Sequence, residues 1–191
     1  MIQALLGAGL LCLAALGSEP LFKQDFQTET DFPQIFCGVE GGSYLIEIQS
    51  GSYTLDFPIP GLEAADFRLE VTFILEGFRG EVGYGAYFRD GETGGYEVEL
   101  TQDGSVYLWR YDESGYELLL EYRNVLWVEA PGENRVSLEC RGASVSLWVN
   151  GHRVFAFPGL APGEGGLGLW ATTYDPKGSI RLRLGELVVF P

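Results

Sequence analysis

The sequence predicts an all-β sandwich of two antiparallel sheets, with little or no helix. From residue 43 onward, short runs rich in Val, Ile, Leu, Tyr, Phe and Trp alternate with polar residues. Gly, Asp or Pro interrupts these runs roughly every 8 to 12 residues, a spacing typical of a sandwich. Helical apolar spacing with a convincing cap is missing throughout, and at most one short helical turn is expected, at 62–66.

The expected strands follow one another along most of the chain. They span 22–27, 43–49, 52–57, 66–76, 82–90, 95–101, 105–111, 116–122, 134–141, 144–150, 152–156, 166–173 and 179–189. Asp-Gly at 90–91 and 103–104 and Asn-Gly at 150–151 are hairpin signals, because these residues tolerate the left-handed backbone region. The strands that flank each signal are therefore expected to be antiparallel neighbours.

Composition and charge indicate one acidic globular domain. Of the 191 residues, 46% are hydrophobic and only 20% are charged, so the chain can bury a sizeable core and general disorder is excluded. The 27 acidic and 12 basic residues leave a net charge of −15, and Lys23 and Lys177 are the only lysines. A field of this sign repels phosphate backbones, so no nucleic-acid partner is expected.

The N-terminal segment has the pattern of a secretory signal peptide. Residues 1–17 form an apolar run without an acidic residue and end in small residues at Ala15 and Gly17. The run is shorter than the roughly 20 apolar residues of a bilayer span. We expect cleavage after Gly17, a single mature domain over 18–191 without a membrane span, and a secreted, periplasmic or cell-envelope location.

Two cysteines, Cys37 and Cys140, remain after such cleavage. An exported chain meets an oxidising environment, so one hypothesis is a disulfide between them. The other is a pair of buried free thiols, because Cys140 follows Val136 and Leu138 on an alternating inward face. The sequence leaves both hypotheses open, since a bridge needs Cα atoms within about 7 Å.

Several expected strands carry the pattern of a known family. The matching segments are DFRLEV at 66–71, YGAYFRD at 84–90, GYEVEL at 95–100, NRVSL at 134–138, VSLWVNG at 145–151, GLGL at 166–169 and LGELVV at 184–189. In this order they resemble the strands of bacterial concanavalin A-like, laminin-G-like domains. The resemblance implies a jelly-roll sandwich but no single function, because the superfamily includes sugar-binding modules, adhesion domains and glycoside hydrolases.

Strand alternation gathers aromatic and charged side chains on one sheet face, provided that strands 82–90, 95–101 and 105–111 are neighbours. The members of this set are Tyr87, Arg89, Glu97, Glu99, Tyr107 and Trp109. Aromatic rings stack on the apolar faces of sugars, and charged groups hydrogen-bond to sugar hydroxyls, so the set is a candidate glycan-binding face. The alternative is a solvated face whose Arg and Glu side chains pair across strands.

Glu97 and Glu99 also raise a catalytic alternative. Their Cα atoms are expected about 7 Å apart on one strand, and glycosidases use carboxyl pairs at such distances. The hydrolases of the resembling fold carry a three-carboxylate E-x-D-x-E strand, whereas residues 96–101 read YEVELT and lack the third acid. The single histidine, His152, follows the turn at 150–151, where an exposed and inert position is expected.

The sequence calls for no cofactor, and calcium is the one candidate that the resemblance adds. Acidic side chains supply the oxygen ligands that calcium prefers, and domains of this resemblance often hold one ion. The candidate ligands are Asp25 in the first strand and Glu186 in the last, because terminal strands often pair in this fold. The resembling domains usually carry Asp at the place of Glu186, so a domain without a bound metal is the first expectation and calcium is the alternative.

Together these observations predict a secreted, non-catalytic binding module for a glycan or a cell-surface polymer. A divergent glycoside hydrolase that uses Glu97 and Glu99 is one alternative. A purely structural or protein-interaction domain of the envelope is another. A groove on the aromatic face is the feature that would favour binding.

Overall fold

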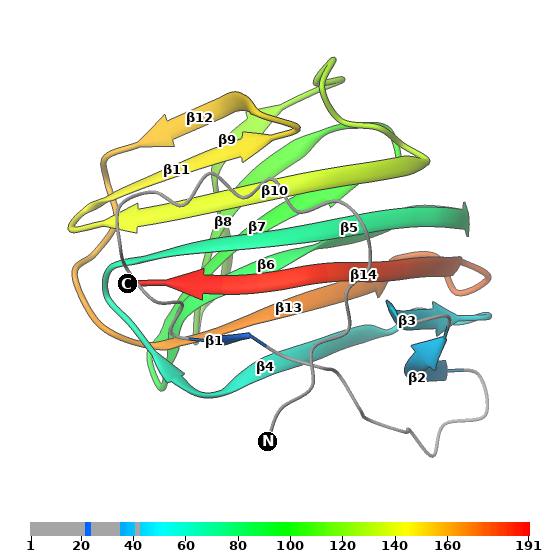
Figure 1. Cartoon of the computed structure of the whole chain (residues 1–191), viewed down its shortest axis with the longest axis horizontal. Helices are drawn as coiled ribbons and strands as arrows, with labels where there is room; N and C mark the ends of the chain where they lie inside the picture. The colour runs from blue at the N-terminus through cyan, green and yellow to red at the C-terminus, as the bar shows by residue number, and fades with distance from the viewer. Residues whose placement is uncertain (1–21, 24–34, 41–42) are drawn as a thin grey trace.

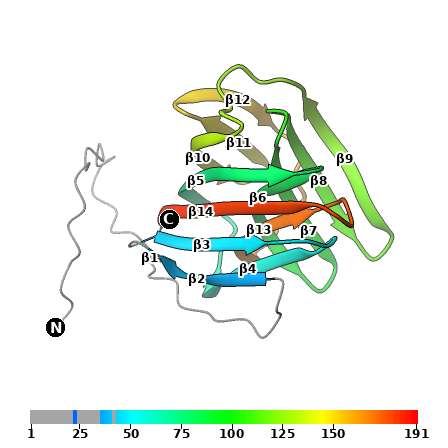
Figure 2. The same cartoon turned by 90° about the vertical axis from the view of Figure 1, so that its right-hand side faces the viewer.

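The computed structural model describes residues 22–23, 35–40 and 43–191, which form two antiparallel sheets packed face to face (Figures 1 and 2). The first sheet has eight strands, with β1 (Phe22–Lys23) paired to β14. The other seven, in spatial order, are β12 (His152–Phe157), β11 (Ser144–Val149), β10 (Gly132–Arg141), β5 (Phe67–Arg79), β14 (Ser179–Phe190), β3 (Ser43–Ile48) and β2 (Ile35–Glu40). The second sheet has six strands, in the order β4 (Thr54–Glu63), β13 (Gly166–Thr173), β6 (Val82–Gly91), β7 (Gly94–Thr101), β8 (Val106–Asp112) and β9 (Gly115–Tyr122).

The predicted all-β architecture is confirmed for the described residues, which contain no helix and hence none that could cross a membrane. The helical turn expected at 62–66 is wrong, because β4 continues to Glu63 and Ala64 N donates to Gly165 O at 3.0 Å. The predicted strand 52–57 ends before Pro58, whereas β4 continues through Pro58 to Glu63. A proline cannot donate to a ladder, but β4 is an edge strand, where proline is tolerated.

The core lies between the two sheets and follows the predicted alternation. Along β5, every second residue from Phe67 to Leu75 is buried, and the residues between them face outward. Phe73 of β5 packs against Tyr84 of β6 across the two layers, with ring centroids 5.3 Å apart. Because each strand turns one set of side chains into this core, the other set of the six-stranded sheet is left to form an outer face.

The two cysteines lie far apart in the first sheet. Cys37 is on β2 and Cys140 on β10, and β3, β14 and β5 run between them. Four strand spacings amount to about 19 Å, well beyond the reach of a disulfide. The disulfide hypothesis is therefore wrong for this pair, and both residues are buried free thiols. Burial raises the pKa of each thiol to about 11.

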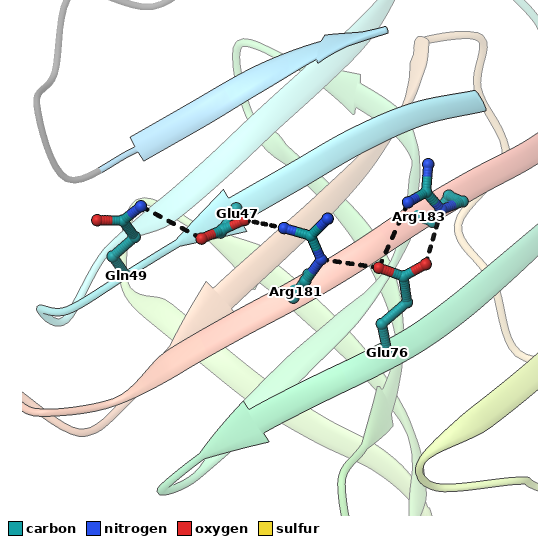
Figure 3. A network of polar contacts seen from close by, with 5 residues as sticks. All are labelled: Glu47, Gln49, Glu76, Arg181 and Arg183. Carbon is teal, nitrogen blue, oxygen red and sulfur yellow. Dashed lines mark hydrogen bonds and ion pairs between the residues drawn. The ribbon is translucent and has the colours of Figure 1, made fainter. Parts of the chain in front are cut away.

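The outer face of the eight-stranded sheet carries a network of paired charges (Figure 3). Arg181 of β14 lies between Glu47 of β3 and Glu76 of β5, and its Nε is 2.8 Å from Glu76 Oε2. Arg183 contacts the other carboxylate oxygen of Glu76 at 2.7 Å. Hydrogen bonds from Arg183 and Arg181 lower the pKa of Glu76. This face therefore holds carboxylates that are matched by arginines.

Candidate functional site

A cavity of about 490 Å³ lies on the outer face of the six-stranded sheet, here called the cleft face. Side chains from all six strands line the cavity. The aromatic members are Tyr87, Trp109, Tyr111, Tyr116, Trp170 and Tyr174. The carboxylates are Asp56, Asp90, Glu97 and Glu99, and the remaining members are Thr54 and Thr172.

The pleat and the strand register bring these side chains together. Glu97 of β7 stands opposite Tyr87 of β6 on one side and opposite Trp109 of β8 on the other, so the expected neighbours are confirmed. Two glycines leave room above the sheet. The ring of Tyr87 lies over Gly168 of β13, and the carboxylate of Glu99 lies over Gly83 of β6, where a Cβ atom would collide with it. Long side chains can therefore lie flat along the cleft face.

Glu99 is the most enclosed carboxylate of the site. Only 4% of the residue is exposed, and both carboxylate oxygens accept hydrogen bonds. Trp109 Nε1 donates to Oε2 at 2.8 Å, and the Tyr174 hydroxyl donates to Oε1 at 2.7 Å. Burial raises the pKa of Glu99, and these two donors oppose that rise. The side chain is thus held in one orientation from two neighbouring elements.

Glu97 lies beside Glu99 on the same strand but has fewer partners. It accepts a long hydrogen bond from the Tyr116 hydroxyl, at 3.3 Å. Burial raises the pKa of Glu97 to about 7, and the charges of Asp56, Glu99 and Asp90 push it the same way. A carboxyl group with this pKa exchanges its proton near neutral pH, which is a common property of functional sites.

Arg89 does not share the face of Tyr87, so this part of the prediction is wrong. Its φ angle is +52°, and the β6–β7 register shifts beyond Phe88, which breaks the alternation. The guanidinium instead donates to the carbonyls of Ala65 at 2.9 Å and Ala161 at 2.6 Å, and also to that of Gly142. The next residue, Asp90, faces the cavity.

Asp90 is held in the cavity by a tyrosine from another strand. The Tyr111 hydroxyl of β8 donates to Asp90 Oδ1 at 2.7 Å. Desolvation and this hydrogen bond raise the pKa of Tyr111. Desolvation also raises the pKa of Asp56 on β4, and the negative charge of Asp90 adds to that rise. The backbone irregularity at Arg89 therefore replaces an expected cation by a carboxylate.

The cavity continues in both directions along β7. A hollow of about 430 Å³ shares Glu99, Trp109 and Tyr174 with it and includes Tyr107, whose ring stacks on Trp109 at 5.7 Å. A hollow of about 470 Å³ at the opposite end shares Tyr111 and is bordered by Arg89 and Arg110 among other residues. The two hollows share lining residues with the central cavity, and the three together are here called the groove.

Four of the six predicted site residues therefore line the central cavity, namely Tyr87, Glu97, Glu99 and Trp109. Tyr107 lies in the adjoining hollow, and Arg89 turns away. Sequence reasoning missed residues contributed by β4, β9 and β13. Among these, Trp170 could have been assigned to the cleft face from the sequence, because it lies between the core residues Leu169 and Ala171. Nothing local indicated that β13 lies beside β6.

The predicted calcium ligands cannot be compared as a pair. Asp25 lies outside the described residues, as does the predicted signal peptide, and Glu186 is exposed on β14. Within residues 22–23, 35–40 and 43–191, no three His, Cys, Asp or Glu side chains form a group that could hold a metal ion. Bound calcium therefore stays the untested alternative to a domain without a metal.

No protein-family model matches the chain, and no curated protein does. Solved structures match its fold. The endo-β-galactosidase from Clostridium perfringens that releases GlcNAcα1-4Gal is 11% identical, with a TM-score of 0.71 over 96% of this chain and 65% of its own. The laminarinase catalytic domain from Thermotoga maritima MSB8 is 13% identical, with a TM-score of 0.62 over 91% and 98%. The carbohydrate-binding module CBM66 from Bacillus subtilis is 15% identical, with a TM-score of 0.57 over 87% and 92%. The fold is a concanavalin A-like jelly-roll sandwich, as the sequence segments predicted.

Proposed function

We propose that the chain is a non-catalytic glycan-binding domain whose ligand lies in the groove of the cleft face. The observation that carries this proposal is the cavity itself, because aromatic rings and carboxylates from all six strands line one continuous hollow. Export through residues 1–17 stays a prediction. It would place the domain where extracellular and cell-surface polymers are found.

The chemistry of the groove suits a sugar chain. The rings of Tyr87 and Trp109 offer flat apolar surfaces for the faces of pyranose rings. Glu97 and Asp90 accept hydrogen bonds, which sugar hydroxyls can donate. The similar structures named above include a carbohydrate-binding module, a laminarinase and an endo-β-galactosidase, which supports the same class of ligand.

Trp109→Ala tests the proposal against a matched tryptophan elsewhere. Trp127 is 41% exposed and stacks on His152 outside the groove. Trp127→Ala therefore removes an indole ring of the same size without changing the lining of the cavity. A glycan array identifies the tightest ligand, and calorimetry then measures both variants. Trp109→Ala should weaken binding by about 1–3 kcal/mol, the loss typical of a truncated aromatic anchor. Trp127→Ala should leave the affinity within about 0.5 kcal/mol of the wild-type value.

Circular dichroism is needed beside the binding measurement. Trp109 donates to the buried Glu99, so its truncation also removes a partner from a carboxylate and lowers stability by about 1–3 kcal/mol. Equal losses of affinity in the two folded variants, or an array without any bound glycan, would refute the proposal.

A second candidate function is glycoside hydrolysis. The observation that favours it is the unequal pair on β7, because Glu97 has a pKa of about 7 while Glu99 is fixed by Trp109 and Tyr174. Glu97 would then be the general acid and Glu99 the nucleophile, in the manner of a retaining enzyme. Release of reducing sugar from the bound glycan, lost in both Glu97→Gln and Glu99→Gln, is the result this candidate requires.

A further inference from the structure

The central cavity has an unusual charge distribution. It holds four carboxylates, and none of the described residues that line it is Lys, Arg or His. Two guanidinium groups, those of Arg89 and Arg110, border the adjoining hollow, and both are already paired. Arg89 donates to backbone carbonyls, while Arg110 lies 2.9 Å from Asp112 and 3.6 Å from Glu117. The carboxylates of the cavity therefore face one another without a cation.

A second, independent feature of the cavity is the indole N–H of Trp170. The residue lines the same cavity and is only 4% exposed, and its Nε1 has no hydrogen-bond partner among the described residues. A buried donor without an acceptor is costly, so it favours a ligand that brings an oxygen. The carboxylates need donors instead, because an ionised carboxylate can only accept hydrogen bonds. A matching ligand must therefore supply an acceptor oxygen together with hydroxyl donors or positive charge.

We propose that the groove binds a glycan that carries cationic amino groups, such as a polymer of de-N-acetylated amino sugars. The cationic amino groups supply positive charge to Glu97, Asp90 and Asp56, and the sugar hydroxyls supply hydrogen-bond donors for the carboxylates and an acceptor for Trp170. The rings of Trp109 and Tyr116 offer π faces to the same cations. This inference rests on the proposed function, since it names the class of glycan that the groove takes.

The titration of the cavity predicts how such binding depends on pH. The titratable groups that face Glu97 come from every strand around it. They are Asp56 on β4, Tyr87 and Asp90 on β6, Glu99 on β7, Tyr111 on β8, Tyr116 on β9 and Tyr174 after β13. Burial keeps the pKa values of Tyr87 and Tyr116 at about 12, so the tyrosines stay neutral. Glu97 loses its proton as the pH rises through about 7, and a ligand whose positive charge does not titrate should then bind more tightly.

Two derivatives of one oligosaccharide test the inference by calorimetry. N-acetylated chitohexaose is neutral, and its fully N-trimethylated counterpart carries a fixed positive charge on each unit at every pH. At pH 8 the trimethylated hexamer should bind about tenfold more tightly than the acetylated one. At pH 5.5 this difference in affinity should be smaller. Because the ligand charge does not change with pH, the smaller difference at pH 5.5 reports protonation of the protein.

A matched pair of variants separates the cavity from the overall charge of the chain. Glu97→Gln removes one carboxylate from the cavity, and Glu139→Gln removes one from the outer face of β10, where Glu139 pairs with Arg141. Both change the net charge of −15 by the same amount. At pH 8, the ratio of the affinity for the trimethylated hexamer to that for the acetylated hexamer should fall about fivefold in Glu97→Gln. The same ratio should stay at the wild-type value in Glu139→Gln.

Each outcome decides between the two proposals. An acetylated hexamer that binds as tightly as the trimethylated one at pH 8 overturns the cationic preference and leaves glycan binding in place. A ratio that falls equally in Glu97→Gln and Glu139→Gln also overturns it, because the attraction then belongs to the net charge. Failure of every glycan, neutral or cationic, to bind refutes the proposed function as well.

Discussion

The two outer faces of the sandwich treat the same residue type in opposite ways. Glu76 on the eight-stranded sheet lies between Arg181 and Arg183, whose hydrogen bonds lower its pKa (Figure 3). Glu97 on the cleft face lies among other carboxylates in a partly closed cavity, and its pKa rises to about 7. Both are strand residues turned away from the core. The neighbours contributed by adjacent strands, rather than the residue type, therefore determine the charge state.

The difference also bears on the ligand proposed for the cleft face. Paired charges on an exposed sheet contribute modestly to stability and require no other explanation. Carboxylates without a cationic partner in a partly closed cavity oppose folding, and the ligand proposed above would compensate for those around Glu97 and Glu99.

The contrast depends on the pleat of β8, which turns Leu108 into the core and Trp109 into the groove. Leu108 is fully buried, so Leu108→Ala removes core contacts and leaves a cavity. We expect the free energy of unfolding to fall by about 2–5 kcal/mol, measured by urea denaturation. Folded Leu108→Ala protein should keep its glycan affinity. A loss below about 1 kcal/mol would mean that the two faces are exchanged.

Glu97→Gln should make the protein more stable at alkaline pH. The folded-state pKa of about 7 lies above the ordinary value of 4.5, so the folded state holds the proton more tightly and wild-type stability falls as the pH rises between these values. The variant lacks this titration. At pH 8 it should exceed the wild type by about 2 kcal/mol in the free energy of unfolding, with the gap closing toward pH 4. A gap that is independent of pH would contradict the raised pKa.

Glu76→Gln should have the smaller and opposite effect. The lowered folded-state pKa of Glu76 contributes stability above its ordinary value of 4.5, and this contribution is lost as the pH falls through the folded-state pKa. At pH 7 the variant should be less stable by about 0.5–1 kcal/mol, because the carboxylate is partly exposed and its ion pairs are screened. The deficit should shrink in acid and in high salt. Stabilisation at pH 7 would remove the contrast between the faces.

Local sequence was sufficient for most of the strands and for the side of each strand that faces the core. In β8, Val106 and Leu108 are buried while Tyr107 and Trp109 face outward, as the two-residue period requires. The turn signals also identified β6, β7 and β8 as neighbours, because hairpins join strands that are adjacent in sequence. These features predicted the middle of the site, with Tyr87, Glu97, Glu99 and Trp109.

Tertiary structure decided the rest of the site. Thr54 and Thr172 are 118 residues apart in sequence, yet their hydroxyls lie 2.9 Å apart, because β4 and β13 meet through crossovers that leave no local signal. The positive φ of Arg89 turned an expected cation toward three carbonyl groups and left Asp90 at the cavity. A strand period specifies the side on which a residue lies, but the charge and pKa of a site depend on which strands pack together, and long-range packing determines that.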